Sequence, residues 1–439
     1  MADLRVTGSP GTRFQGRLRV PGDKSITHRV LMLGAIAQGV TRVQDFLDGG
    51  DCQATMGALA ELGVPVERQG TAALAVHGVG QTGFRAPTLP LNCGNSGTTM
   101  RLLAGLLAGQ PFDSVLDGSV QLRRRPMSRV TEPLRTMGAR IQTVDGRAPL
   151  RVAGSRLTGT RHRLAVPSAQ VKSALLLAGL FADGETVVQE PVPSRDHTER
   201  MLRAMGAPLT GDTGAWHVRR LDRPLRPLEL RVPGDPSSAA FPWALAAASG
   251  GRVRVEGVGV NPGRTGFLQA LEAMGARVQV LGGTERAGEP VADVEVTGGG
   301  LRGVTLGGAR IVAMIDELPV LAVVATQAEG ETVVQDAGEL RVKESDRIDA
   351  LVAELTRLGA AIEARPDGFV VRGPCRLRGA MVDSRGDHRL AMALAVAGAL
   401  ADGETIIGKG DCFADSYPGF DGAMRESGVR GLSVERYGR

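Results

Sequence analysis

The 439-residue sequence repeats one pattern six times, and this repetition limits the folds that it can adopt. In each copy an Ala- and Leu-rich segment leads through a glycine into β-branched residues, as in "LLLAGLFADGETVVQE". A second phrase, such as "ELGV" or "AMGA", alternates with the first and places a glycine where an amphipathic helix should end. The glycines of the first phrase are Gly39, Gly109, Gly184, Gly250, Gly330 and Gly403, and those of the second are Gly63, Gly138, Gly206, Gly275, Gly359 and Gly428.

The turn "VPGD" begins at Val20 and again at Val232, and it divides the six copies into two groups of three. Pro fixes φ, Gly permits a tight turn and Asp can cap a helix, so each turn suits the entry to a domain. We therefore expect an α/β (α+β) fold with two similar globular domains, residues 21–233 and residues 1–20 plus 234–439. The most apolar segments have no polar face and should be buried helices. A substrate cleft is expected between the two domains.

Composition favours a mildly basic soluble protein over a nucleic-acid or membrane protein. The net charge is +5 and aromatic residues make up 3%, too few to supply a stacking surface for single-stranded nucleic acid. The longest apolar stretch, residues 390–401, is too short to span a bilayer, and the first residues resemble no secretory signal. The four cysteines are dispersed, which predicts reduced thiols in a cytoplasmic protein. A third interpretation of the basic charge is a cleft in which Arg and Lys bind small anionic substrates.

Basic and small polar residues of the first half stand at expected helix starts. Lys24, Ser25 and Arg29 follow the first VPGD turn, where free N–H groups and cations suit an anion. No basic residue follows the second VPGD turn, which we interpret as structural only. The loop at residues 92–101, "NCGNSGTTMR", can bring N–H groups close to a phosphate or carboxylate, but it is not a nucleotide P-loop. Gln170 enters an apolar helix, where its amide needs a partner.

Charged residues of the second half lie at comparable points of the repeat. Asp316 and Glu317 follow the strand-like run "RIVAMI". Residues 343–347, "KESDR", place a Lys and an Arg four positions apart with a Glu between them, and residues 387–389, "DHR", begin the last buried helix. Each group alone is compatible with a surface ion pair. Together they lie at helix starts or strand ends, where ligand sites of α/β units gather.

In combination these motifs resemble the 5-enolpyruvylshikimate-3-phosphate synthases, a branch of the enolpyruvyl transferase family. The motifs that carry the resemblance, in family order, are "PGDKSITHR", "GNSGTTMRLLAG", "RRRPM", "VPSAQVKSALLLAG", "SRDHTERML", "DELPVLAV", "LRVKESDRI" and "DHRLAMAL". The resemblance implies two domains of three βαβαββ-type units each, an inside-out α/β barrel. It also implies transfer of the enolpyruvyl group of phosphoenolpyruvate to the 5-hydroxyl of shikimate 3-phosphate, in aromatic amino-acid biosynthesis, with no cofactor and no metal.

The resemblance further implies roles for individual residues. Asp316 corresponds to the proton acceptor on the 5-hydroxyl, Glu344 is a candidate for protonating the methylene carbon, and Lys24 is a third catalytic candidate. The residues that it assigns to substrate binding are Lys24, Ser25, Arg29, Asn95, Gly97, Arg125, Ser168, Ala169, Gln170, Arg195, Asp316, Lys343, Arg347 and Arg389. Glycine at position 97 also implies sensitivity to glyphosate, because insensitive members carry a side chain there.

One position departs from the family pattern, and two other functions stay open. Asp415 stands where many members have a Lys, for which Lys409 is a nearby substitute. The sister enzyme that acts on UDP-N-acetylglucosamine carries a Cys before its "RP" motif, and the loop "DGSVQLRRRP" has none. A non-catalytic anion- or RNA-binding repeat protein is disfavoured, because buried acids such as Asp316 and Glu344 would weaken polyanion binding. We expect a monomer with small-molecule substrates and no nucleic-acid or membrane partner.

Overall fold

The structure, a computed structural model, describes residues 2–212 and 214–435. Residues 1, 213 and 436–439, which the predicted domains include, lie outside the described residues. Two units can be distinguished by their internal contacts. Unit 1 comprises Met1–Pro21, Pro233–Thr284 and Pro290–Arg439, and unit 2 comprises Gly22–Val232 and Glu285–Glu289. Both long boundaries fall inside the VPGD turns, whereas no sequence pattern marked the short segment 285–289.

Each unit contains three four-stranded sheets among the described residues, and all six sheets share one strand order. In the sheet β10-β11-β13-β12, the first pair is parallel and the other two pairs are antiparallel. The chain reaches this sheet in the order β10-α6-β11-α7-β12-β13, which is one βαβαββ unit. The predicted six-unit organisation and the inside-out α/β fold class are therefore confirmed.

The elements of unit 2 follow the chain from the first VPGD turn to the second. Its strands are β3 (Gln38–Gln44), β4 (Val66–Arg68), β5 (Ala73–Val79), β6 (Leu91–Asn92), β7 (Ser114–Asp117), β8 (Arg140–Val144), β9 (Arg147–Ala153), β10 (Arg161–Arg163), β11 (Glu185–Gln189), β12 (Leu209–Gly211), β13 (Ala215–Arg219) and β14 (Glu229–Arg231). Its helices are α1 (Lys24–Ala35), α2 (Gly50–Glu61), α3 (Gly97–Ala108), α4 (Val120–Arg123), α5 (Ser128–Thr136), α6 (Ala169–Gly179) and α7 (His197–Ala204).

Unit 1 combines the two ends of the chain. Its strands are β1 (Asp3–Thr7), β2 (Gln15–Leu18), β15 (Arg252–Gly259), β16 (Arg277–Arg286), β17 (Glu289–Thr297), β18 (Thr305–Leu306), β19 (Gly330–Val334), β20 (Ala361–Arg365), β21 (Gly368–Gly373), β22 (Met381–Asp383), β23 (Glu404–Gly408) and β24 (Gly431–Glu435). Its helices are α8 (Pro236–Ser249), α9 (Gly266–Ala273), α10 (Ala309–Val312), α11 (Leu318–Ala325), α12 (Arg347–Arg357), α13 (His388–Leu400) and α14 (Phe420–Glu426), with 3₁₀ helices η1 (Pro262–Arg264), η2 (Gly338–Val342) and η3 (Gly410–Asp415).

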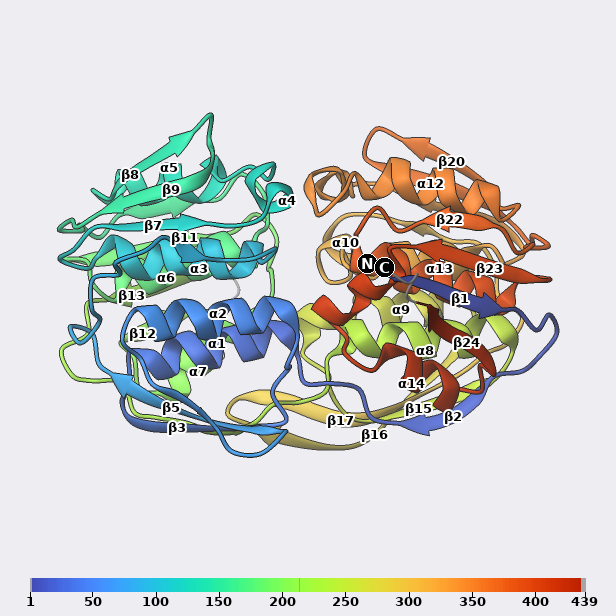
Figure 1. Cartoon of the computed structure of the whole chain (residues 1–439), viewed down its shortest axis with the longest axis horizontal. Coiled ribbons are helices and arrows are strands. Elements are labelled where there is room, and N and C mark those ends of the chain that lie inside the picture. The colour runs from blue at the N-terminus through green and yellow to red at the C-terminus, as the bar shows by residue number, and fades with distance from the viewer. Residues whose placement is uncertain (1, 213, 436–439) are drawn as a thin grey trace. The chain divides into compact units, whose positions relative to one another are not determined.

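Three buried helices lie inside each unit, with the sheets around them: α1, α3 and α6 in unit 2, and α8, α11 and α13 in unit 1 (Figure 1). Beyond their first turns these helices are largely apolar, and they are covered on all sides, as the sequence predicts for its most apolar segments. Their first turns coincide with the polar motifs of the sequence. The fold thus concentrates those motifs at one end of each helix trio. No helix of the described chain has the length and apolar character that crossing a membrane requires.

Strands from outside the sequential order complete three of the sheets. β1 lies between β23 and β24, and β2 pairs with β15, so both strands of the first 20 residues join sheets of unit 1. At the other end of unit 2, β14 pairs with β3. The glycines of the second phrase have positive φ beyond their helices, as predicted: Gly63, Gly138, Gly206, Gly275, Gly359 and Gly428.

The run "RIVAMI" was predicted to be a strand, and that prediction is wrong. Residues Ala309–Val312 form the short helix α10 instead. Ile311 and Met314 are both buried, and their spacing of three positions places them on one helical face. A short apolar run fits either period, so the sequence alone does not separate a strand from a buried helical turn.

Candidate active site

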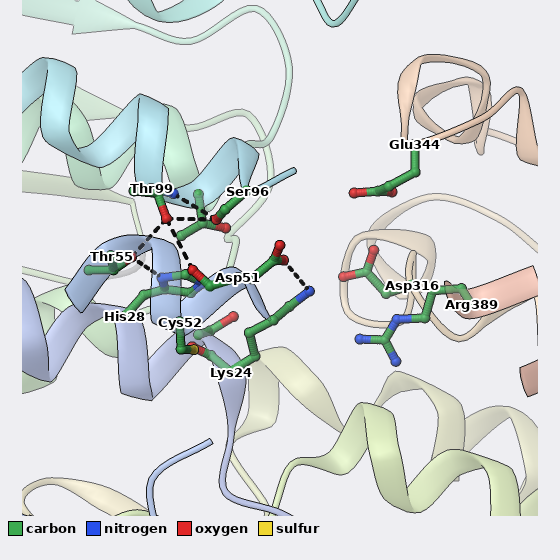
Figure 2. A network of polar contacts seen from close by, with 12 residues as sticks. Lys24, His28, Asp51, Cys52, Thr55, Ser96, Thr99, Asp316, Glu344 and Arg389 are labelled. Atoms are coloured by element: carbon green, nitrogen blue, oxygen red, sulfur yellow. Dashed lines mark hydrogen bonds and ion pairs between the residues drawn. The ribbon is translucent and has the colours of Figure 1, made fainter. Parts of the chain in front are cut away.

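Lys24 occupies the first position of α1 in unit 2. Its Nζ lies 3.1 Å from Oδ2 of Asp51, in the first turn of α2. Figure 2 shows this ion pair together with a chain of hydroxyl groups: Thr55 contacts Thr99 at 2.7 Å, and Thr99 donates to Ser96 at 2.8 Å. The ion pair fixes the ammonium group at the start of a buried helix, where anions are favoured.

Arg29 lies one turn further along α1 and is 3% exposed. Its Nη1 donates to the Ser25 carbonyl at 2.9 Å, so the two residues share a helix face. Nε donates to the Thr198 hydroxyl at 2.7 Å and Nη2 to the Ser173 hydroxyl at 3.0 Å. Burial lowers the pKa of Arg29 to about 10, and the guanidinium stays protonated at neutral pH. Arg195 reaches the same place, with Nη1 3.5 Å from the Ser25 hydroxyl.

Gly97 brings the start of α3 close to two buried guanidinium groups. Ser96 caps the helix by accepting a hydrogen bond from the Thr99 N–H. A Cβ atom on Gly97 would lie 2.7 Å from Nη1 of Arg101 and 2.9 Å from Nη1 of Arg125. Glycine is therefore the residue that leaves room for both cations beside a helix N-terminus. This combination is suited to a phosphate or carboxylate.

Gln170 finds its partners within the protein. Its Oε1 accepts a hydrogen bond from Arg101 at 2.7 Å, and its Nε2 donates to the Thr98 hydroxyl at 2.8 Å. Ser168 caps the same helix, which begins at Ala169. These contacts join the first turns of α3 and α6. In the loop that precedes α3, Asn95 accepts a hydrogen bond from the Ser119 hydroxyl.

A buried ion cluster lies beneath the start of α6. Lys172 Nζ is 2.8 Å from Glu190 Oε2 and 2.8 Å from Glu199 Oε1, and all three side chains are at most 2% exposed. Burial alone would lower the pKa of Lys172, but Glu199 and Glu190 raise it above its usual value. Glu190 also accepts the N–H groups of Ser168 and Ser194, at 3.3 Å and 3.2 Å. The cluster thus connects the start of α6 to the loop that carries Arg195.

In unit 1, Arg347 contacts three carboxylates at the start of α12. Nη1 lies 3.3 Å from Asp316, Nη2 lies 2.7 Å from Glu344 and Nε lies 2.9 Å from Asp387. Burial alone would lower the pKa of Arg347, but Asp387, Glu344 and Asp316 raise it above its usual value. Lys343 Nζ is 3.4 Å from the same Asp316 oxygen. Asp316 therefore faces two cations, and it shares one of them, Arg347, with Glu344. Figure 2 shows the Asp316 and Glu344 side chains in the same part of unit 1.

Arg389 occupies the second position of α13 and is 4% exposed. Asp387 caps that helix by accepting the Arg389 N–H at 2.9 Å. The Arg389 guanidinium donates to the Ser237 carbonyl in the first turn of α8, at 3.2 Å. Unit 1 thus presents cations together with carboxylates, whereas the predicted residues of unit 2 are mainly cations and small polar groups.

Comparison with known proteins agrees with these motifs. The family model of EPSP synthase (3-phosphoshikimate 1-carboxyvinyltransferase) matches residues 9–424. A 3-phosphoshikimate 1-carboxyvinyltransferase of Desulforudis audaxviator is 52% identical over 428 residues, covering 96% of this chain and 98% of that protein. The enzyme of the same name from Methylococcus capsulatus is 50% identical over 430 residues, covering 97% and 98%. The chain belongs to the EPSP synthase family.

A solved EPSP synthase from Acinetobacter baumannii has the same fold, with a TM-score of 0.87 and 40% identity, covering 99% of this chain and 100% of that one. Membership of the EPSP synthase family is thus supported over the whole length of both units. Within each unit, the residues assigned from the family motifs lie in the first two turns of helices or in the segments that precede helices.

Sequence reasoning missed the residues that hold the predicted ones in place. Asp51, Arg101 and Glu190 contact predicted site residues, and Lys172 contacts Glu190. One signal was available for Lys172, because a lysine inside an otherwise apolar buried helix requires a buried acid. The acids themselves lie in loops or first turns with no such pattern. Among the described residues, no group of three or more His, Cys, Asp or Glu side chains is arranged to hold a metal ion.

Lys409, the suggested substitute for the family lysine, forms an ion pair with Asp383 in unit 1. Its Nζ lies 3.2 Å from Asp383 Oδ2, and the side chain is 45% exposed. Asp415, which the family resemblance aligns with a lysine, ends the 3₁₀ helix η3. The ion pair with Asp383 argues against Lys409 as a replacement for that lysine.

Proposed function

We propose that this chain transfers the 1-carboxyvinyl group of phosphoenolpyruvate to the 5-hydroxyl of shikimate 3-phosphate and releases phosphate. The matched family and the relatives carry the name of this transferase activity. The reaction belongs to the shikimate pathway of aromatic amino-acid biosynthesis. The names support this reading over UDP-N-acetylglucosamine as acceptor.

The residues of unit 2 support binding of the anionic groups. Both substrates carry a phosphate and a carboxylate, and a charge-assisted hydrogen bond to each contributes about 1.5–3 kcal/mol. We assign Ser25, Arg29, Arg195 and the start of α6 at Ser168–Gln170 to shikimate 3-phosphate. The start of α3 at Gly97, together with Arg125 and Asn95, is assigned to phosphoenolpyruvate. Lys24 is assigned to both.

The residues of unit 1 support proton transfer. Asp316 is assigned as the base that accepts the proton of the 5-hydroxyl, and Lys343 and Arg347 beside it favour its charged form. Glu344 is assigned as the acid that protonates the methylene carbon. Arg347 and Arg389 are assigned to phosphoenolpyruvate, and Lys343 to shikimate 3-phosphate. An acid and a base within reach of one arginine suit a reaction that adds and then removes a proton.

The proposed reaction is an addition followed by an elimination. The methylene carbon of phosphoenolpyruvate takes a proton, and the 5-oxygen of the acceptor forms a bond to the adjacent carbon while its own proton passes to Asp316. The resulting tetrahedral carbon carries both the acceptor oxygen and the phosphate oxygen. The bond from the tetrahedral carbon to the phosphate oxygen then breaks and phosphate leaves, while the methyl carbon gives its proton back to Glu344 and the double bond is restored. Lys24 and the guanidinium groups stabilise the charge that develops on phosphate.

The observation that carries the acid–base assignment is the contact of Arg347 with both Asp316 and Glu344. The test measures phosphate release from phosphoenolpyruvate with and without shikimate 3-phosphate, for the wild type and for Asp316→Ala. Release should require both substrates, and kcat should fall by about 10²–10⁴-fold in the variant.

A matched control is Asp402→Ala, which removes an aspartate of unit 1 paired with Arg376 at 2.9 Å on the exposed surface. Its kcat should equal that of the wild type. Release that proceeds with UDP-N-acetylglucosamine in place of shikimate 3-phosphate would overturn the acceptor assignment. An Asp316→Ala variant with full activity would overturn the role of Asp316.

We also propose that the enzyme acts as a monomer in the cytoplasm. A single chain supplies both sets of predicted site residues, and Cys52, Cys93, Cys375 and Cys412 are free thiols. A mass of 45.9 kDa by light scattering supports the monomer, and twice that mass contradicts it.

A further inference from the structure

The second VPGD turn is more than a structural joint. It leads into α8, where three groups of Ser237 each have a partner. The N–H donates to Asp235 Oδ1 at 2.8 Å, the hydroxyl donates to the Glu317 carboxylate, and the carbonyl accepts from Arg389 at 3.2 Å. Ser237 therefore connects the first turn of α8 with two residues that border the proposed site.

A buried arginine completes this cluster. Nη2 of Arg264 lies 2.9 Å from Asp235 Oδ1 and 2.8 Å from the Ser237 hydroxyl. The hydroxyl thus accepts from Arg264 and gives its single proton to Glu317, so its orientation is determined. All four side chains are at most 4% exposed. Hydrogen bonds of this kind, formed away from water, keep a fixed geometry because breaking one leaves a buried polar group without a partner.

The cluster adjoins two residues of the proposed site, Asp316 and Arg389. Glu317 is the residue before α11 and directly follows Asp316. In the part of the chain that the structure describes, the Ser237 carbonyl is the protein group that accepts a hydrogen bond from the Arg389 guanidinium. The remaining N–H groups of that guanidinium are available for an anion. A shift of the Ser237 backbone would therefore move the anion-binding face of Arg389.

We propose that Ser237 and Glu317 are positioning residues that hold the guanidinium of Arg389 in place for phosphoenolpyruvate. The proposal rests on the assignment of Arg389 to phosphoenolpyruvate made above. Neither residue touches substrate; they act through the Ser237 carbonyl. Loss of this support should weaken the binding of phosphoenolpyruvate and leave that of shikimate 3-phosphate nearly unchanged. The residues assigned to shikimate 3-phosphate belong to unit 2 except Asp316 and Lys343, and neither of these two contacts Ser237 in the interactions described.

The test compares the KM values of the two substrates in the full-length enzyme. Ser237→Ala removes the hydroxyl that Glu317 holds, and it should raise the KM for phosphoenolpyruvate about tenfold while the KM for shikimate 3-phosphate changes less than about twofold. Ser249→Ala is the matched control, since that serine lies at the other end of α8 and its hydroxyl accepts the Phe14 N–H at 3.2 Å. Both of its KM values should stay unchanged. A purely structural defect would lower the active fraction without moving either KM.

Two substitutions of Glu317 distinguish the effect of its side-chain length from the effect of its charge. Glu317→Asp keeps the charge but shortens the side chain, so it should raise the KM for phosphoenolpyruvate as Ser237→Ala does. Glu317→Gln keeps the length and an oxygen that accepts from Ser237, so its KM should lie near the wild-type value. The opposite order, with Gln impaired and Asp normal, would overturn the proposal. These mild changes also test it if Ser237→Ala fails to fold.

Arg389→Ala, measured in parallel, distinguishes this proposal from the function on which it rests. A raised KM for phosphoenolpyruvate in Arg389→Ala but not in Ser237→Ala or Glu317→Asp would overturn the positioning role alone. An unchanged KM in Arg389→Ala would overturn the assignment of Arg389 and the positioning role with it. Raised values in all three, with Glu317→Gln normal, would support both.

Discussion

Gly97 is the position at which one added carbon should have the clearest effect on substrate binding. Its Cβ would lie 2.7 Å from a terminal nitrogen of Arg101 and 2.9 Å from one of Arg125. Both atoms are ends of flexible side chains, so the fold can accept alanine if the guanidinium groups move. We expect Gly97→Ala to raise the KM for phosphoenolpyruvate about tenfold and the inhibition constant of glyphosate by a larger factor.

Steady-state kinetics with increasing glyphosate would measure both constants. Gly57→Ala is a suitable control, because Gly57 is an exposed glycine of α2 and a Cβ there meets nothing within 4 Å. A wild-type enzyme that keeps full activity in millimolar glyphosate, or a Gly97→Ala variant with an unchanged inhibition constant, would contradict the assignment of this position to phosphoenolpyruvate.

At the scale of elements, His28 joins three helices of unit 2. Its Nδ1 lies 2.7 Å from the Thr55 hydroxyl of α2, which in turn lies 2.7 Å from the Thr99 hydroxyl of α3 (Figure 2). Burial, reinforced by Lys24 and Arg29, lowers the pKa of His28 well below its usual value. The imidazole is therefore neutral in the folded protein, and protonation opposes the packing of α1 against its neighbours.

This lowered pKa predicts the direction of an acid effect on stability. Below about pH 6.5 the unfolded chain binds a proton at this histidine while the folded chain does not. Stability therefore falls as the pH falls, by at most about 1.4 kcal/mol per pH unit from this group. Urea unfolding at about pH 7.5 and about pH 5.5 should show a smaller loss in His28→Gln than in the wild type. An equal loss in His28→Gln and in the wild type would contradict this prediction.

The sequence predicted the elements better than their partners. Glycines at regular intervals predicted six units, because a helix C-terminus needs a left-handed residue whatever surrounds it. The helix α10 was mistaken for a strand, since a run of a few apolar residues has no readable period. The roles of Ser237 and Glu317 depend on contacts between α8 and α11, which lie about 80 positions apart in the chain. Such contacts leave no local pattern, and the second VPGD turn was accordingly interpreted as structural only.

For the whole molecule, the chain enters and leaves unit 2 at neighbouring points. The Pro21 carbonyl accepts a hydrogen bond from the Asp235 N–H at 2.9 Å within unit 1, and a Cβ on Gly22 would lie 3.1 Å from Val232 within unit 2. In each unit, therefore, the two segments at which the chain passes to the other unit contact each other. Unit 1, however, depends on strands that precede unit 2 in the sequence.

This dependence predicts which fragments fold. Residues 233–439 alone lack β1, which separates β23 from β24, and β2, which pairs with β15. They also lack the buried side chains Leu4, Val6, Phe14 and Leu18, whose burial contributes roughly 6–12 kcal/mol. A loss of that size is comparable with the whole stability of a domain, about 5–15 kcal/mol, so this fragment should not unfold cooperatively.

A chain in which residues 1–21 are joined to 233–439 by a short glycine linker should fold, because the hydrogen bond from Asp235 to Pro21 places the two ends side by side. Residues 22–232, which contain all three sheets of unit 2, should fold as well. Thermal unfolding followed by circular dichroism would measure the cooperativity of these three polypeptides. A cooperative transition in residues 233–439 alone would show that β1 and β2 are dispensable, and that the order of strands in the sheet does not determine which part of the chain is a folding unit.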